Sequence, residues 1–118
     1  ETVARRVDKA VDWVLSDVQA SAEQKQKVSA IARQTITDLA PLRDKHRAAR
    51  QSAVNLMAAP TIDRAAIESL RAEQMQMADQ ASRRVSQALA DVADVLTPEQ
   101  RVKLKERLDK RMAGRRWS

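Results

Sequence analysis

The side chains that could carry out covalent or metal chemistry are scarce in this sequence. It has no cysteine and a single histidine, His46, which excludes thiolate catalysis, disulfides, cysteine–zinc sites and a multi-histidine metal site within one chain. Its only glycine, Gly114, excludes a glycine-rich phosphate-binding loop. Acidic pairs such as Asp8 and Asp12 are spaced for one face of a helix, where we expect them to face solvent. We therefore expect a protein that is not an enzyme and that has neither a metal site nor a cofactor.

Composition and periodicity predict an all-α protein. Hydrophobic residues make up 43% of the chain and aromatic residues 2%, with one glycine and three prolines, which argues against a sheet with its aromatic strands and glycine-rich turns. Apolar residues recur every three or four positions, as on one face of a helix. The expected helices cover residues 3–18, 22–57, 63–95 and 98–113, with a bend near Pro41 and a mobile tail over residues 114–118.

A pattern of hydroxyl residue, any residue, Glu, Gln and basic residue occurs at two of the expected helix starts. The two copies are Ser21-Ala22-Glu23-Gln24-Lys25 and Thr97-Pro98-Glu99-Gln100-Arg101. In such a capping box the hydroxyl of Ser21 or Thr97 accepts from the backbone N–H three residues on, and the side chain of Gln24 or Gln100 reaches back. Pro98 at the first helical position is a further start signal. Taken alone, the repeat is explained by two ordinary helix starts.

The lengths of the two central helices predict an extended molecule. A helix of more than 30 residues is about 45 Å long, whereas a compact chain of this size has a radius of gyration of about 13–14 Å. The apolar stripes of these helices are also rich in alanine, which buries little area. We expect a single domain over residues 1–118, in which two long helices form an extended, curved hairpin and a second copy completes the core as an antiparallel homodimer.

The two boxes, at the outer ends of a long helical pair, resemble the paired LTxxQ motifs of the Spy/CpxP family of bacterial periplasmic proteins. The second motif is complete, as Leu96-Thr97-Pro98-Glu99-Gln100, and the first, Ala20-Ser21-Ala22-Glu23-Gln24, has Ala for Leu and Ser for Thr. The resemblance covers roughly residues 15–112. It implies a cradle-shaped antiparallel homodimer in the periplasm, with a signal peptide removed ahead of Glu1.

The same resemblance implies a Spy-type chaperone that works without ATP and binds partly folded proteins on a concave surface. The alternative is a CpxP-like regulator of the envelope stress response, which binds one dedicated partner such as the periplasmic domain of a sensor kinase. A metal-binding branch of the family uses histidine-rich ligands, and the single histidine of this chain departs from that pattern. His46 lies on the apolar stripe of its helix, where packing or hydrogen bonding is its expected role.

A mixed basic and apolar stripe on the second helix is the candidate client surface. Its positions step by three and four, combine arginine with apolar residues and include no acid: Ile36, Ala40, Arg43, Arg47, Arg50, Val54 and Met57. Flexible apolar side chains and long cations together give weak contacts to many sequences. The alternative is that the arginines lie at the rim of a dimer interface. On the third helix, the same surface could extend over Met75, Arg84 and Val85, although methionine at helical spacing is also typical of a core.

Most of the net charge lies near the carboxyl terminus. Residues 97–118 hold eight basic and three acidic residues, so that five of the six net positive charges lie there. Such an end could bind nucleic acid or an anionic membrane, and a solvated helix and tail is the simpler interpretation. Because the charge is confined to one end, we do not expect a nucleic-acid partner. No apolar run approaches the roughly 18 residues that span a bilayer.

Overall fold

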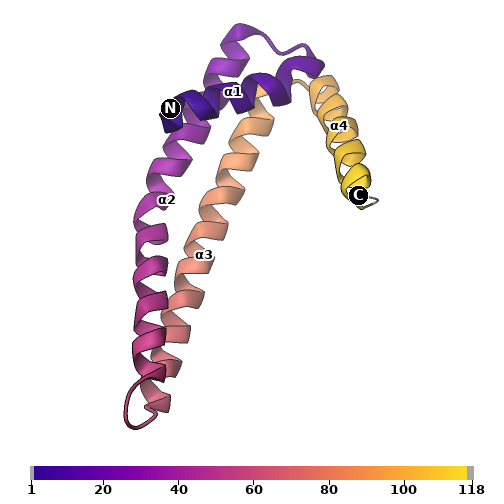
Figure 1. Cartoon of the computed structure of the whole chain (residues 1–118). Helices are drawn as coiled ribbons and strands as arrows, with labels where there is room; N and C mark the ends of the chain where they lie inside the picture. Colours follow the sequence, from indigo (N-terminus) through magenta and orange to yellow (C-terminus); the bar gives the residue numbers. More distant parts are fainter. Residues whose placement is uncertain (1, 117–118) are drawn as a thin grey trace. The chain divides into compact units, whose positions relative to one another are not determined.

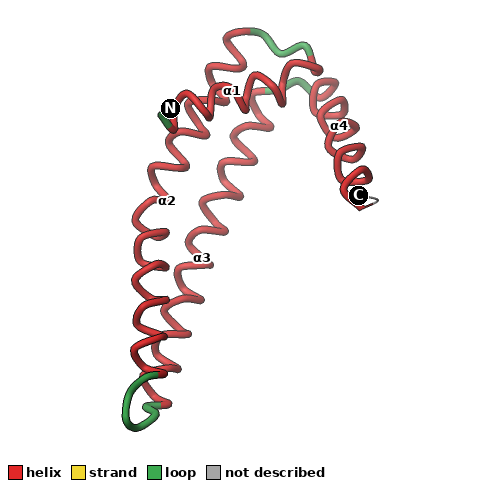
Figure 2. Tube along the Cα trace, in the orientation of Figure 1, coloured by secondary structure: helices red, strands yellow, loops and turns green. Residues whose placement is uncertain are grey.

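The computed structural model describes residues 2–116, and within that range it consists of helices and short connections without a strand (Figures 1 and 2). The elements are α1 (Val3–Leu15), a 3₁₀ turn η1 (Ser16–Val18), α2 (Ala22–Met57), α3 (Arg64–Val95) and α4 (Pro98–Arg116). The all-helical prediction is confirmed. The first expected helix is divided, because its last turn tightens into η1 before Gln19 takes a left-handed conformation with φ of 60°. Trp117 and Ser118 of the expected tail lie outside the described residues.

The expected end of the last helix at residue 113 is wrong. Helix α4 continues through Gly114 to Arg116, and Gly114 does not have the positive φ of a left-handed helix cap. A glycine inside a helix costs only about 1 kcal/mol relative to alanine. The glycine therefore weakens the last turn of α4 without ending it.

Helix α2 is continuous through Pro41. Proline has no backbone N–H, so this residue cannot donate the helical hydrogen bond to the carbonyl of Thr37. The helical assignment on both sides of Pro41 is nevertheless unbroken from Ala22 to Met57. The missing donor costs one hydrogen bond and leaves α2 as one element.

The chain forms two compact units, and the first comprises residues 1–34 and 88–118. Its core is a small aliphatic cluster from α1, η1, α2 and the connection between α3 and α4: Val11, Leu15, Val18, Val28 and Leu96. Leu15 and Val18 are the most deeply buried, at 1% exposure. The connection between α3 and α4 places Leu96 in this cluster, so the residue that precedes the second capping box also anchors it.

Helix α4 is held to α1 and η1 by arginines. The guanidinium groups of Arg107 and Arg111 lie 4.3 and 4.5 Å from the ring centroid of Trp13. Arg107 also donates to the carbonyl of Val14 at 3.1 Å and pairs with Asp17 at 3.1 Å. Cations over an indole ring are attracted by its negative face. The indole therefore fixes two arginines of α4 while half of its own surface stays exposed.

The second unit, residues 35–87, is a hairpin of the adjoining parts of α2 and α3 (Figure 1). The turn ends at Asp63, whose carboxylate accepts from the backbone N–H of Ala66 at 3.0 Å and so caps α3. Within this unit Thr35 is the one residue that is buried. Two helices without a third layer cannot cover their apolar stripes, which leaves these stripes partly open to solvent. The expected single domain over residues 1–118 stays a prediction.

An ion pair between α1 and α2 makes the first unit sensitive to acid. The guanidinium of Arg33 donates to both carboxylate oxygens of Asp8, and this bond, with help from Ser29, lowers the pKa of Asp8 below its ordinary 3.8. A carboxyl group whose pKa is lower in the folded state stabilises that state above its unfolded pKa, and the contribution is lost as pH falls through the folded pKa. Asp8→Asn should therefore lower stability at neutral pH and have no effect well below pH 3.8.

Urea unfolding of the wild type and of Asp8→Asn over this pH range measures that difference. Asp91→Asn is the control, because Asp91 is exposed and forms no ion pair with any residue in the described part of the chain. A constant gap between the wild type and Asp8→Asn from neutral to acid pH would show that the ion pair does not contribute.

Candidate functional site

Both predicted capping boxes are present. At the start of α2, the Gln24 backbone N–H donates to Ser21 Oγ at 3.0 Å, and the Ser21 N–H donates to Gln24 Oε1 at 2.9 Å. At the start of α4, the Gln100 N–H donates to Thr97 Oγ1 at 3.2 Å, and the Thr97 N–H donates to Gln100 Oε1 at 2.9 Å. Pro98 is the first residue of α4, as its position after the hydroxyl residue predicts. These reciprocal bonds satisfy two of the N–H groups that a helix start leaves unpaired.

The two boxes are also joined to one another through their glutamines. Gln24 Nε2 donates to Gln100 Oε1 at 2.7 Å, and Gln100 Nε2 donates to Gln24 Oε1 at 3.1 Å. The second N–H of each amide donates to the backbone two residues ahead of the opposite box. For Gln24 this acceptor is the carbonyl of Val95 at 3.1 Å, and for Gln100 it is the carbonyl of Gln19 at 3.3 Å. Each amide oxygen accepts twice and each amide nitrogen donates twice, so both side chains are saturated.

This arrangement shows what the repeated pattern does within one chain. The hydroxyl residue and the glutamine start a helix, and the glutamine amide ties that start to the other box. The sequence predicts the caps and not the pairing, because the pairing depends on two segments more than 70 positions apart. The signal that could have indicated it is the identity of the third helical position, which is glutamine and not glutamate in both boxes.

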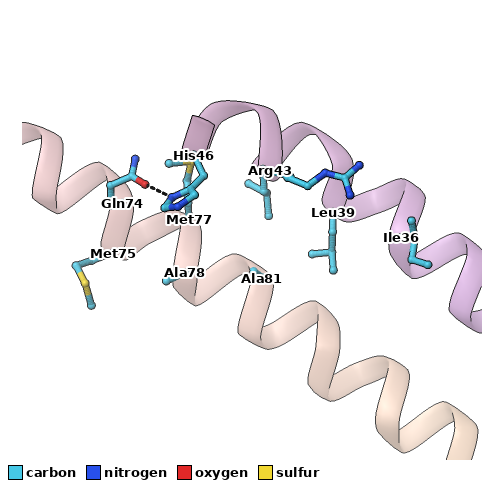
Figure 3. Close-up of a pocket in the computed structure, with 10 residues that line it drawn as sticks. Ile36, Leu39, Arg43, His46, Gln74, Met75, Met77, Ala78 and Ala81 are labelled. Carbon is cyan, nitrogen blue, oxygen red and sulfur yellow. Dashed lines mark hydrogen bonds between the residues drawn. The ribbon is translucent and has the colours of Figure 1, made fainter. Parts of the chain in front are cut away.

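The second candidate site is a groove of about 620 Å³ on the hairpin of residues 35–87 (Figure 3). Its lining comes from both helices and is mostly apolar: Ile36, Leu39, Leu42, Arg43 and His46 of α2, and Gln74, Met75, Met77, Ala78 and Ala81 of α3. Leu39 extends from α2 toward α3 (Figure 3). An open apolar groove with few polar groups is the usual form of a binding site for apolar ligands.

The structure divides the predicted client surface. Ile36, Arg43 and Met75 line the groove. The other members of the stripe on α2 are not part of that lining: Ala40 is half-buried, and Arg47, Arg50, Val54 and Met57 are exposed. Leu39 and Leu42 of α2 are half-buried and also line the groove.

The cations near the groove differ in their partners. Arg43, Arg47 and Arg50 form no ion pair with any side chain in residues 2–116. Arg84 is different, since its Nε lies 2.9 Å from the carboxylate of Asp38 across the hairpin. The charge of Arg84 is thus balanced within the unit, while its neighbour Val85 is exposed.

His46 takes a hydrogen-bonding role in the wall of the groove. Its Nδ1 lies 2.9 Å from Gln74 Oε1 (Figure 3), which fits the expectation of a hydrogen-bonded residue. The side chain is exposed and not packed in a core. The amide nitrogen of Gln74 is buried without a partner in the described structure.

Comparison with known protein families identifies the family of this chain. The profile of the heavy-metal resistance family matches residues 5–103. The chain belongs to this heavy-metal resistance family. It is a helical family related to the Spy/CpxP-like periplasmic proteins, so the resemblance of the two boxes is supported at this broader level. No curated protein and no solved structure matches the chain.

The name of the heavy-metal resistance family implies a metal ion, which the side chains described here do not fit. Among residues 2–116, no group of three His, Cys, Asp or Glu side chains is placed to hold one. The single His46 uses one ring nitrogen on Gln74. Soft and borderline metals need several thiolate, imidazole or carboxylate ligands in defined geometry.

Within residues 2–116, none of the helices has the length and apolar character that a membrane span requires.

Proposed function

We propose that this member of the heavy-metal resistance family is a periplasmic chaperone of the Spy type, which binds partly folded proteins without ATP. The observation that carries the proposal is the open apolar face of the hairpin of residues 35–87. Thr35 is the one buried residue described there, while the groove side chains stay accessible. A stable monomer usually covers such a face, so its exposure marks a contact surface.

The chemistry of the groove suits partly folded clients. Methionine and aliphatic side chains adapt to apolar segments of varied shape, and Arg43 at the edge, without an ion-pair partner among the described residues, is available to client carboxylates. Contacts of this kind are individually weak, which lets a folding client leave. The absence of a fixed polar pattern favours broad specificity over recognition of one sequence.

A homodimer would complete the unit that the monomer leaves open. The chain is expected to sediment at twice its monomer mass at micromolar concentration, because the second copy would cover apolar area on the two long helices. Analytical ultracentrifugation with parallel circular dichroism measures both mass and helicity. A fully helical monomer at this concentration would contradict the dimer.

The aggregation assay tests the proposed function. The purified chain, without ATP, should suppress aggregation of several unrelated denatured proteins at near-stoichiometric ratios. A helical protein of similar size and charge serves as the control for nonspecific effects. Failure with all clients would overturn the chaperone proposal, and strong binding of one native partner would favour a dedicated regulator instead.

A further inference from the structure

A second groove lies on α4, in the unit of residues 1–34 and 88–118. Its volume is about 620 Å³. Its centre is a row of apolar residues at a spacing of four, Leu104, Leu108 and Met112. Residues at this spacing form a ridge along one side of a helix. Leu108 and Met112 are 44% and 61% exposed, so the described chain leaves much of the outer end of this ridge open to solvent.

Basic residues flank the apolar ridge on both sides. Arg101 and Lys105 form the row on one side, and Arg111 and Arg115 form the row on the other. The one acid in the lining, Asp109, pairs with Lys105. The groove lining thus carries four basic groups and one acidic group beside the apolar ridge.

Two of these arginines are held in place before any partner arrives. Arg111 lies over the ring of Trp13, with its guanidinium 4.5 Å from the centroid. Arg101 donates to the carbonyl of Ala93 at 3.2 Å. A side chain that is already ordered loses less conformational entropy on binding. Guanidinium groups also suit paired hydrogen bonds to carboxylates.

The narrowness of the ridge argues against a membrane as its partner. At 100° per residue, each basic row lies within about 60° of the apolar ridge on the surface of the helix. A helix that lies in a bilayer surface needs an apolar face of about 100° or more, with its cations on the opposite face. Insertion of this ridge would carry cations from both flanks toward the acyl chains. The pattern instead matches helix pairing, in which charges that flank the apolar seam of one helix form ion pairs with opposite charges on the partner helix.

We propose that this face of α4 binds an acidic amphipathic helix of another protein, one with an apolar ridge between two rows of Asp and Glu. The partner's ridge would lie beside Leu104, Leu108 and Met112, and its carboxylates would meet the two basic rows. This site is separate from the hairpin groove of the proposed function, because none of its lining residues lies within residues 35–87. Loss of either activity would leave the other intact.

Binding of designed peptides to the full chain tests the proposal. The probe is a capped helical peptide with leucine at the seam positions and glutamate at both flanks, and its matched control carries lysine at those flanks. Binding of the glutamate peptide should shift the methyl resonances of Leu104, Leu108 and Met112, and added salt should weaken this binding. Equal binding of the lysine peptide would overturn the proposal. So would binding to phosphatidylglycerol-containing vesicles without binding of the glutamate peptide.

Matched charge reversals locate the site on α4. Lys105→Glu combined with Arg111→Glu should lower the affinity for the glutamate peptide by about tenfold or more, because both flanks of the ridge then repel the peptide. Lys103→Glu combined with Lys110→Glu makes the same charge change at exposed positions outside the groove. This double variant should lower the affinity for the glutamate peptide by less than about threefold. Equal losses of affinity in the two double variants would mean that net charge alone attracts the peptide, and would overturn the proposed site on α4.

A charge-neutral variant guards against misfolding as the cause. Arg111 stacks on Trp13, so its reversal could loosen α4, which circular dichroism and thermal melting would reveal. Leu108→Ser leaves every charge in place and removes an exposed side chain. This variant should bind the glutamate peptide more weakly than the wild type does, by a similar factor at low and high salt. Unchanged affinity in Leu108→Ser, with helicity retained, would show that the apolar ridge is not part of the contact.

Discussion

Gln24→Glu should destabilise the protein by about 2 kcal/mol, although it preserves the helix cap. Glutamate and glutamine serve equally at the third position of a capping box, so the bond to the Ser21 backbone N–H survives. The amide nitrogen, however, donates to Gln100 Oε1 and to the carbonyl of Val95 at 2.7 and 3.1 Å. A carboxylate oxygen there faces two acceptors and cannot donate to either. Chemical denaturation of the variant and the wild type measures the loss.

Gln26→Glu is the matched control for this substitution. It adds the same charge two residues further along α2, at an exposed position, and should change stability by a few tenths of a kcal/mol at most. By the symmetry of the two boxes, Gln100→Glu should resemble Gln24→Glu. A Gln24→Glu protein as stable as the Gln26→Glu protein would show that the amide pair adds nothing to the caps.

The pH dependence of Gln24→Glu separates the lost donor from other effects. The neighbouring carbonyl oxygens disfavour the charged carboxylate in the folded state, so its pKa should be raised there above the unfolded value of about 4.3. The penalty should then be present at neutral pH and decrease as pH falls through the raised pKa, since a protonated carboxyl group can donate again. This trend has the opposite sign to that of the Asp8–Arg33 pair.

Local signals in the sequence were sufficient for the helices and their starts. The hydroxyl and glutamine of each box act within four residues of one another, and the structure confirms the bonds of Ser21 and Thr97. The last helix runs past its expected end at residue 113, because Gly114 does not take a positive φ and a glycine without one can lie inside a helix. A propensity of about 1 kcal/mol does not decide where a helix ends.

Features that depend on tertiary placement could not be predicted in the same way. The periodicity of Leu39 and Leu42 shows that they lie on an apolar face, but it does not show whether anything covers that face. In the structure they are half-buried in an open groove. The bond between Arg84 and Asp38 likewise joins positions 46 apart in the sequence. Pairs of this kind follow from how α2 and α3 align, which the spacing within one helix does not contain.

The sharpest test of the proposed chaperone compares the hairpin groove with the rest of the predicted stripe. Ile36→Ser combined with Met75→Ser removes two apolar side chains from the groove lining. Val54→Ser combined with Met57→Ser removes two from outside it, at 53% and 73% exposure. Burying an aliphatic or methionine side chain contributes about 1.5–3 kcal/mol. The groove variant should therefore hold clients at least about tenfold more weakly, while the other variant retains most of its affinity.

Charge reversal on neighbouring turns of α2 extends the comparison to the capture step. Arg43 lies in the groove lining and Arg47 does not, yet both are exposed. Arg43→Glu should slow the capture of acidic clients more than Arg47→Glu does, and the gap should narrow with salt, because screening at physiological ionic strength acts over about 8 Å. Aggregation kinetics with each helical, correctly assembled variant measure both effects. If the Val54 and Met57 variant and Arg47→Glu give the larger losses, clients bind along the outer stripe of α2 and the groove is not their site.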